Sequence, residues 1–479
     1  MRRLMTTAIL LADLLLASSA RAQTVPASAE RPWHGSAELK MQAYAKNVTD
    51  SRFTVDQSET YSLAELIDLA QAHNPATRAA WERARSQAAV LGITRSELYP
   101  TLAAAALSQT ESGQTFFGNR FFGQTTQTFE LALDLNYTVF DFGARSGRID
   151  AARARLLSAN FAFNDTHRSL IDQVEQAYYR LLNSIGQEDS AQASLANAKA
   201  VEQAAQERLT NGLATLPDVL EARSATAQAE YDLQAVVGAE EIARGDLANA
   251  VGTSASVAIK VQPLDQLPTP DSIGETVEQA IDRAFAQRPD LMQQVAEIRT
   301  ANARLKQARA AYYPTLGVNV SPAIPSLYGM QQPFHWSHTA DLTGSLSFNL
   351  SWTVFDGGAR KNLAAQAQAD LRAAEAQTNL QKNQIADEVW TAYSNLNTAF
   401  RQRRAAVALL EAANQSYSAV LESYKYGLRN LLDVTAAQRS LAQARSADVF
   451  ARTQVLTAVA DLAFTTGDAI KPHKGTSRP

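Results

Sequence analysis

Two segments of the chain alternate between apolar and polar residues over about the length of one strand. From 129 to 139 every second residue is apolar: Phe129, Leu131, Leu133, Leu135, Tyr137 and Val139. From 345 to 354 the alternation returns, with Leu346, Phe348, Leu350, Trp352 and Val354 as the apolar positions. A period of two predicts strands with one apolar and one polar face. Each segment is as long as a tilted membrane-spanning strand, about 9 to 11 residues, but a sheet packed on one face in a soluble domain shows the same alternation.

Aromatic residues gather near both ends of these segments. The predicted loop tips at one end carry Phe116, Phe117, Phe121, Phe122, Phe334 and Trp336. The other end carries Tyr99, Tyr137, Phe140, Tyr312, Tyr313, Trp352 and Phe355. Aromatic girdles at the two interfaces are typical of membrane strands. We therefore interpret Tyr99, Tyr137, Phe140, Tyr313, Trp352 and Phe355 as membrane-interface aromatics.

Two other segments have the composition of very long helices. Between Gly147 and Gly212 there is no proline and one glycine, and between Gly358 and Gly427 there is neither. At about 1.5 Å per residue, roughly 65 residues make a rod of about 100 Å, which is too long for a compact domain. Apolar residues also recur every seven positions, as coiled-coil packing requires: Ile149, Leu156, Phe163, Leu170 and Ala177.

The chain repeats one plan with a period near 215 residues. LYPTL at 98–102 returns as YYPTL at 312–316, TVFDFGAR at 138–145 as TVFDGGAR at 353–360, and NGLATLPDV at 211–219 as YGLRNLLDV at 426–434. Each copy predicts a short helix, a helix that begins at a proline, a strand pair, a long helix, a tight turn and a second long helix. We divide the chain into a signal peptide (1–22), an N-terminal extension (23–60), repeat 1 (61–270), repeat 2 (271–467) and a C-terminal tail (468–479). Repeat 1 has strands at about 102–140 and long helices at about 144–210 and 215–251, and repeat 2 has strands at about 316–355 and long helices at about 358–425 and 430–466.

The turns between the long helices are marked by glycine. Gly212 and Gly427 stand where a helix must end, because glycine adopts the left-handed conformation beyond the last turn freely. A new helix follows each, and Thr215 with Asp218, like Asn430 with Asp433, has the spacing of a capping residue and a carboxylate. Helix capping and a functional role are both open for the two aspartates, since a helix N-terminus favours a carboxylate in any protein.

Composition limits the classes of function. The chain has 479 residues, a formal net charge of -4 and no cysteine, which excludes disulfides and lipid anchoring through an N-terminal cysteine and gives no basic footprint for nucleic acid. The start, with Arg2, Arg3, an apolar stretch and an A-x-A pattern, predicts a signal peptide cleaved after Ala22. Past it no run of about 18 apolar residues occurs, so any membrane contact must use strands. Four strands cannot close a barrel, and open edges cannot face lipid, which predicts an oligomer.

Residues for catalysis are not found in the sequence. His335 and His338 lie three positions apart, but with no cysteine and only Asp341 nearby they do not make a convincing metal site. Nucleophile-elbow, zinc-protease and phosphate-loop patterns are absent from the sequence. We therefore expect no enzyme activity, no cofactor and no metal. An exported coiled-coil structural or adhesin-like surface protein is the alternative, but it has no need for two amphipathic strand pairs.

The paired helical hairpins, the YPTL and TVFD segments beside strand pairs, and YKYGLRNLLDVTAAQRSL at 424–441 resemble the outer-membrane efflux proteins typified by TolC, from about Tyr61 to Gly467. The resemblance implies a homotrimer in the outer membrane of a Gram-negative bacterium, with a 12-stranded β-barrel continuous with a periplasmic α-helical barrel. It implies a passive export duct of a tripartite efflux or type I secretion system. The implied partners are outer-membrane lipid, a periplasmic adaptor (membrane fusion protein) and, through the adaptor, an inner-membrane pump of RND, ABC or MFS type.

The resemblance also implies a gate at the two turns. Tyr424 and Arg429 match the family's linking tyrosine and arginine, Asp433 matches the first aspartate of a ring, and Asp218 matches their carboxylate partner. A bond from Arg429 to Asp218 would be the lock, although a solvated charge is the alternative for Arg429. Ala436 and Pro217 depart from the family's best-known member, which implies a single ring and a weaker lock. The adaptor would contact the hairpin tips at Gly212, Leu213, Gly427 and Leu428.

Overall fold

The computed structural model describes residues 36–47, 53, 55–270, 272–331 and 335–468. The chain divides into two units, residues 1–53 and residues 54–479. The described part of the first unit contains helix α2, Ser36–Asn47. The predicted signal peptide and residues 469–479 of the predicted tail lie outside the described residues, so the expected cleavage after Ala22 stays a prediction.

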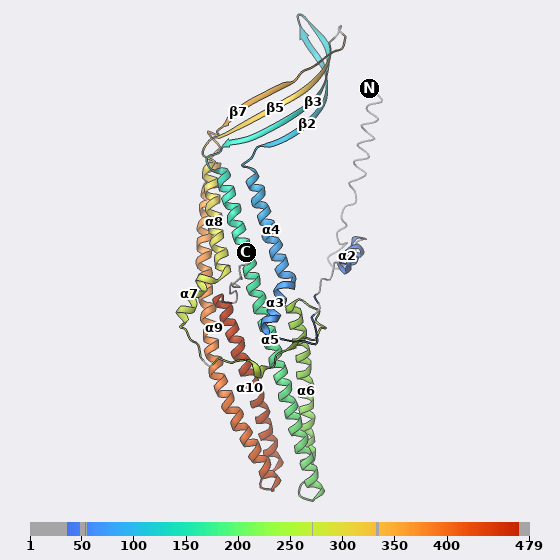
Figure 1. The fold of residues 1–479 in the computed structure, drawn as a ribbon, viewed down its shortest axis with the longest axis vertical. Helices are drawn as coiled ribbons and strands as arrows, with labels where there is room; N and C mark the ends of the chain where they lie inside the picture. Colours follow the sequence, from blue (N-terminus) through green and yellow to red (C-terminus); the bar gives the residue numbers. More distant parts are fainter. Residues whose placement is uncertain (1–35, 48–52, 54, 271, 332–334, 469–479) are drawn as a thin grey trace, which may run out of the picture. The chain divides into compact units, whose positions relative to one another are not determined.

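The second unit contains two successive series of helices and strands (Figure 1). The first series is α3 (Leu63–His73), α4 (Pro75–Ser96), the strands β2 and β3, α5 (Ala144–Thr210) and α6 (Leu216–Val251). The second is α7 (Val277–Gln287), α8 (Pro289–Ala310), the strands β5 to β7, α9 (Ala359–Lys425) and α10 (Leu431–Thr466). β1 (Thr60–Tyr61), just before α3, pairs in parallel with β4 (Lys260–Val261), which lies between the two series and precedes a short 3-10 helix at Leu264–Gln266. Both α4 and α8 begin at a proline, whose fixed φ and missing N–H suit the first helical position.

The larger sheet is antiparallel and is formed from both series. β2 (Thr101–Phe117) pairs with β3 (Arg120–Phe140), β3 pairs with β5 (Thr315–Gln331), and β5 pairs on its other side with β6 (Ser337–Ala340) and β7 (Thr343–Ser351). β6 and β7 therefore share the place of one outer strand. The interruption between them lies opposite Ile324 and Pro325, and Pro325 has no N–H with which to continue the ladder.

The register of the sheet gathers the alternating apolar residues on one face. Leu135 of β3 lies opposite Leu102 of β2 and Val320 of β5, and Val320 lies opposite Leu346 of β7. The other face is polar, and there Asn319 donates to Asn136 at 2.9 Å and Ser321 donates to Asp134 at 2.6 Å. Apolar side chains on the first face are exposed in the single chain, for example Leu131 at 65% and Phe348 at 68%. The predicted two-faced strands are confirmed.

One predicted strand is shorter than its pattern. The alternation continues to Val354, but β7 ends at Ser351, so Trp352 and Val354 lie beyond it. Ser351 pairs with Thr315, the first residue of β5, and the residue before Thr315 is Pro314, which cannot donate to a ladder. The strand ends because its partner does.

The repeated TVFD-x-G-A-R motif forms the joint between strand and long helix. The Asp141 carboxylate accepts from the backbone N–H of Gly143 at 3.2 Å and of Arg145 at 2.6 Å. Asp356 accepts in the same way from Gly358 at 3.0 Å and Arg360 at 3.0 Å. Gly143 and Gly358 have φ of +98° and +90°, which glycine adopts without strain. Each aspartate thus satisfies free N–H groups at the start of α5 or α9.

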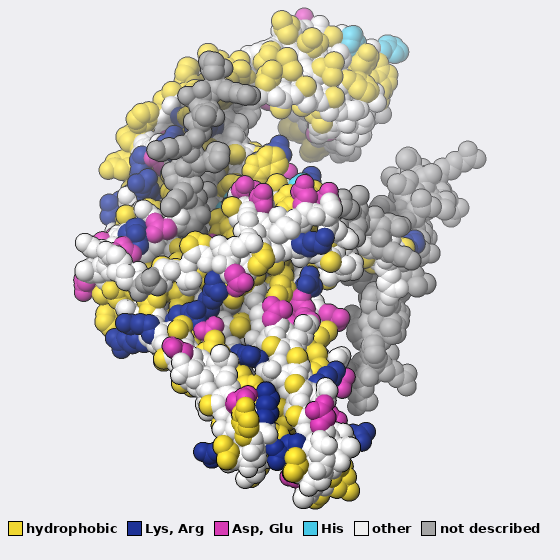
Figure 2. All heavy atoms as spheres, turned by 60° about the horizontal axis from the view of Figure 1, so that its bottom comes forward, with side chains coloured by type: hydrophobic (Ala, Val, Ile, Leu, Met, Phe, Trp, Pro, Cys, Tyr) yellow, Lys and Arg dark blue, Asp and Glu magenta, His cyan; other side chains and the backbone are white. Residues whose placement is uncertain are grey.

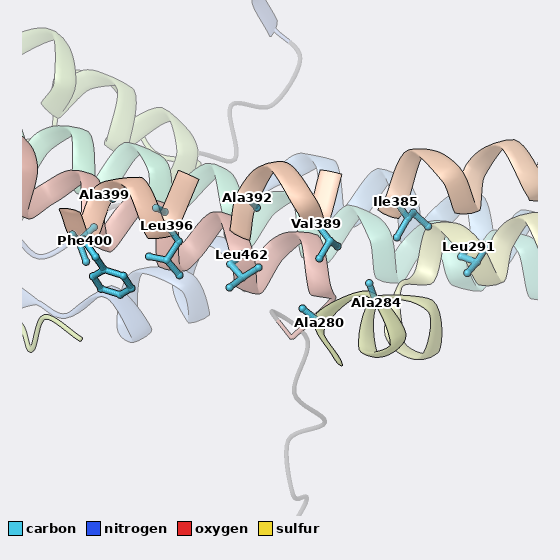
Figure 3. Close-up of a cluster of buried hydrophobic side chains, with 12 residues drawn as sticks. Ala280, Ala284, Leu291, Ile385, Val389, Ala392, Leu396, Ala399, Phe400 and Leu462 are labelled. Carbon is cyan, nitrogen blue, oxygen red and sulfur yellow. The ribbon is translucent and has the colours of Figure 1, made fainter. Parts of the chain in front are cut away.

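The helices pack through apolar stripes that include most of the predicted heptad positions. Ile149, Leu170 and Ala177 of α5 are buried. A second cluster joins α7, α8, α9 and α10, with Leu291, Ile385 and Leu462 among its members (Figure 3). Thr378 interrupts the apolar pattern of α9, yet it is buried and its hydroxyl donates to the Ala374 carbonyl at 2.9 Å. Among the helices that the structure describes, none combines the length and the apolar character needed to cross a membrane.

Candidate functional site

The two turns between the long helices have the same geometry. Gly212 and Gly427 have φ of +70° and +76°, as the sequence predicts. After α5, the N–H of Leu213 donates to the Arg208 carbonyl at 2.7 Å, and after α9 the N–H of Leu428 donates to the Ser423 carbonyl at 2.9 Å. These bonds close the last helical turn in the manner of a Schellman motif. Within the second unit, both turns lie at the end of the helices that is away from the large sheet (Figure 1).

The helices that follow the turns are capped differently. The Asp218 carboxylate accepts from the Thr215 N–H at 2.8 Å and from the Thr215 hydroxyl at 2.7 Å. These bonds hold the pKa of Asp218 below its usual value, with a smaller contribution from the charge of Arg208. In the second turn the cap is the Asn430 side chain, which accepts from the Asp433 N–H at 2.9 Å. The Asp433 carboxylate therefore takes no part in that cap bond.

Around the turns, apolar and charged side chains share the surface. Leu213 and Leu428 are 65% and 78% exposed. Leu216, Leu432 and Tyr426 are exposed beside them. Figure 2 shows hydrophobic and charged side chains intermixed at this end of the helices. A contiguous apolar patch rimmed by polar residues is typical of a surface that binds another protein.

The residues predicted for the gate lie at the second turn and at the start of α6. Tyr424 is buried, with 3% of its surface exposed. Within this chain Arg429 contacts the carboxylate of Asp433 at 3.7 Å, four positions later, and both side chains are open to solvent. The pair that the described residues make is therefore Arg429 with Asp433, and the expected bond from Arg429 to Asp218 stays a prediction.

Arg208 is a residue of this site that sequence reasoning missed. Its guanidinium donates to the Tyr424 carbonyl at 2.6 Å, to the Lys425 carbonyl at 3.4 Å and to the Leu213 carbonyl at 3.3 Å. It also lies over the Tyr424 ring, 4.7 Å from the centroid. The local sequence contains one relevant signal, a basic residue in the last turn of a helix. Nothing in the pattern indicates that this side chain reaches the other hairpin.

Beneath the turns, the two hairpins of the chain share one apolar core. Val201 and Ala205 of α5 and Val219 of α6 cluster with Tyr417 of α9 and Val434 of α10. Burial raises the pKa of the Tyr424 phenol, and its hydroxyl has no hydrogen-bond partner among the described residues. A groove of about 690 Å³ lies between α5, α6 and α10.

The predicted interface aromatics lie at the junction of sheet and helices. Phe142 stacks on Tyr313 with ring centroids 5.0 Å apart and meets Phe140 edge-on at 4.6 Å. The Trp352 indole N–H donates to the Tyr312 carbonyl at 3.2 Å. Tyr99 and Phe355 are 70% and 86% exposed, and Tyr137 is half-buried. Their position at a membrane interface stays a prediction.

The described residues include no group of three or more His, Cys, Asp or Glu side chains placed to hold a metal ion. Of the two histidines considered for a metal, His338 stacks on Tyr328 with centroids 4.3 Å apart.

Comparison with known proteins gives consistent matches over most of the chain. The sequence profile of the family described as "Outer membrane efflux protein" matches residues 66–253 and 280–468. Protein CyaE of Bordetella pertussis is 27% identical over 413 residues, 86% of this chain and 85% of that protein. Outer membrane protein OprJ of Pseudomonas aeruginosa is 26% identical over 473 residues, 94% of this chain and 93% of that protein. The solved structure of the outer-membrane channel OprN matches with a TM-score of 0.75 and 20% identity over 87% of this chain and 96% of that chain, which shows the shared fold alone.

Proposed function

The chain belongs to the outer membrane efflux protein family, and on this premise we propose that it is the outer-membrane export duct of a tripartite efflux or type I secretion system. As a family member it is an outer-membrane channel protein with a periplasmic helical portion, and it is not an enzyme. The observation that carries the proposal is the two-faced sheet, whose apolar face is exposed and whose polar face could line a passage. A strand of a membrane β-barrel has one apolar face toward lipid and one polar face toward the water-filled interior.

The proposed assembly is a homotrimer. Its three sheets would form a 12-stranded β-barrel, continuous with a periplasmic α-helical barrel made from the long helices of both repeats. The outer strands of the sheet support this, because among the strands that the structure describes β2 pairs on one side only, with β3. An unpaired edge exposes backbone N–H and C=O groups that lipid cannot satisfy. Pairing with the next copy satisfies them.

The proposed gate lies at the hairpin tips. Asp218, Tyr424, Arg429 and Asp433 are its residues, with Asp433 lining the constriction. The contact between Arg429 and Asp433 supports the proposal. Both side chains are open to solvent, so either one can exchange this partner for another. Such an exposed pair contributes at most about 1 kcal/mol, so exchange costs little.

The proposed partners are a periplasmic adaptor (membrane fusion protein) and, through it, an inner-membrane pump of RND, ABC or MFS type. The adaptor would contact the tips at Gly212, Leu213, Gly427 and Leu428. The exposed Leu213 and Leu428 support this surface, because burying two such side chains against a partner contributes roughly 1.5–3 kcal/mol each. Outer-membrane lipid would contact the apolar face of the sheet and the interface aromatics.

Two measurements test the proposed function. Fractionation should find a heat-modifiable trimer in the outer membrane that resists sarkosyl, whereas a rod released from the cell or soluble in the periplasm would contradict the proposal. Purified protein in planar bilayers should then give discrete conductance steps. Arg429→Ala combined with Asp218→Ala should raise the open probability, and no change relative to the exposed-residue variant Arg223→Ala would remove these two residues from the gate.

A further inference from the structure

Arg208 joins the two hairpins of one chain. It lies in the last turn of α5, and all the acceptors of its guanidinium are backbone carbonyls at the two turns. Two of them, Tyr424 and Lys425, end α9, and the third, Leu213, belongs to the turn that follows Arg208 itself. One side chain thus holds both turns at once.

The acceptors explain why an arginine suits this place. The last carbonyls of a helix have no partner within it and carry the negative end of the helix dipole. A guanidinium is always charged and presents several N–H donors in a rigid plane. It therefore satisfies the end of α9 while its face covers the Tyr424 ring at 4.7 Å. A lysine has a single ammonium group, so it could make only some of these hydrogen bonds and would lack the planar face that covers the ring.

The arrangement is not reciprocal. The position of the second hairpin that corresponds to Arg208, four residues before the glycine, is Ser423, whose hydroxyl donates within its own helix to the Ala419 carbonyl. The neighbouring Lys425 contacts Glu422 of the same helix at 3.3 Å. In these contacts the side chain that reaches the other hairpin is therefore Arg208 of α5, which binds the end of α9.

We propose that Arg208 is a positioning residue of the gate: its guanidinium latches the α9 tip to the α5 tip within one protomer and so holds the closed arrangement. This inference rests on the proposed function. It also assigns a role to Tyr424, whose ring and backbone carbonyl both contact the Arg208 guanidinium. Its hydroxyl, buried and without a partner among the described residues, is not the group that makes the latch.

The test compares four variants of the full-length chain in planar bilayers. Arg208→Ala should raise the open-to-closed ratio by about tenfold, which corresponds to about 1.4 kcal/mol, and Arg208→Lys should raise it by less. Tyr424→Phe keeps the ring and the carbonyl, so its effect should be much smaller than that of Arg208→Ala. Arg223→Ala, which removes an exposed arginine of α6, is the matched control. If Tyr424→Phe opens the channel as much as Arg208→Ala, or if Arg208→Ala behaves as Arg223→Ala, the latch is wrong.

Amide hydrogen exchange tests the latch without relying on conductance. Arg208→Ala should speed exchange of the Gly427 and Leu428 amides, which close the last turn of α9, while Arg223→Ala should not. If the wild-type protein gives no conductance steps, the proposed function fails, and the exchange result alone then decides the latch. If Arg208→Ala does not fold, Arg208→Lys takes its place, and unchanged exchange in that variant overturns the latch.

Discussion

At the scale of single residues, Asp218 and Asp433 occupy equivalent positions in the two repeats but make different contacts. The Asp218 carboxylate accepts two bonds from Thr215, so it is tied to the start of α6. At the start of α10 the capping acceptor is the Asn430 side chain. The Asp433 carboxylate is consequently free to face Arg429. The sequence left capping and function open for both aspartates, and the structure assigns side-chain capping to Asp218.

This difference predicts unequal costs of substitution. Asp218→Ala and Asn430→Ala should each lower the free energy of unfolding by about 1 kcal/mol, because each leaves helix N-terminal groups without a partner. Asp433→Ala keeps the backbone N–H that Asn430 binds, so it should cost about 0.5 kcal/mol or less. Amide exchange of the first turns of α6 and α10 measures this locally, and equal effects of Asp218→Ala and Asp433→Ala would contradict the assignment.

Glu175 of α5 makes stability depend on pH. Burial raises its pKa to about 7, and the nearby carboxylates of Asp172 and Asp461 add to the effect. In the unfolded chain the same carboxyl ionises near its ordinary pKa of 4.5. Between these values the folded state binds more protons than the unfolded state, so stability falls as pH rises from about 4.5 to about 7.

We predict that Glu175→Gln removes this loss. The variant should be more stable than the wild type at pH 8 by at most about 3.5 kcal/mol, since a pKa difference of one between the folded and unfolded states corresponds to about 1.4 kcal/mol. Thermal unfolding measured at pH 5 and pH 8 checks it, with Glu230→Gln, at an exposed position of α6, as the control. Equal differences between pH 5 and pH 8 in the two variants would contradict the role of Glu175.

At the scale of elements, a glycine allows the backbones of α5 and α8 to approach closely. A Cβ on Gly147 would lie 2.9 Å from the Gln307 backbone nitrogen and 3.0 Å from the Ala303 carbonyl oxygen. Gly238, in α6, has no atom within 4 Å of the same position. Both glycines lie inside long helices, yet only the first is required by packing.

Gly147→Ala should therefore destabilise the protein by about 1–3 kcal/mol, because two helix backbones must move apart. Gly238→Ala should stabilise it by about 0.5–1 kcal/mol, because alanine favours a helix. Thermal unfolding in detergent distinguishes the two, and the same sign for both variants would show that the contact of α5 with α8 can relax.

The long helices were predictable because their limits are local. The expected range of 144–210 became Ala144–Thr210, and 358–425 became Ala359–Lys425. A glycine stands at each end of both stretches, and no proline interrupts them. The end of β7 and the reach of Arg208 were not predictable, since each depends on a partner distant in the sequence. Thr315 pairs with Ser351, and the Tyr424 carbonyl lies 216 positions from Arg208.

At the scale of the whole molecule, the two ends of the second unit impose different demands on the chain. The large sheet exposes apolar side chains and ends at β2, which among the described strands pairs with β3 alone, whereas the tips expose charged groups such as Arg429 and Asp433. The joints at Asp141 and Asp356 connect these regions with bonds made inside the chain. The proposed trimer and adaptor would therefore add contacts at both ends and leave the joints unchanged.

The demand for lipid can be tested on adjacent residues of one strand. Leu131, 65% exposed, lies on the apolar face of β3, and Ala132 lies on the other face, opposite Ala105 and Ala323, which leave space for a longer side chain. Leu131→Arg should cost about 2–4 kcal/mol of stability in a bilayer if this position lies near its midplane, whereas Ala132→Arg should cost much less because its side chain would enter water. The yield of heat-modifiable trimer in outer-membrane fractions, and unfolding by urea in lipid vesicles, measure the difference. Because the two residues are neighbours, depth in the membrane is matched, and only the face of the sheet differs. A larger cost for Ala132→Arg would place lipid on the polar face and contradict the proposed duct.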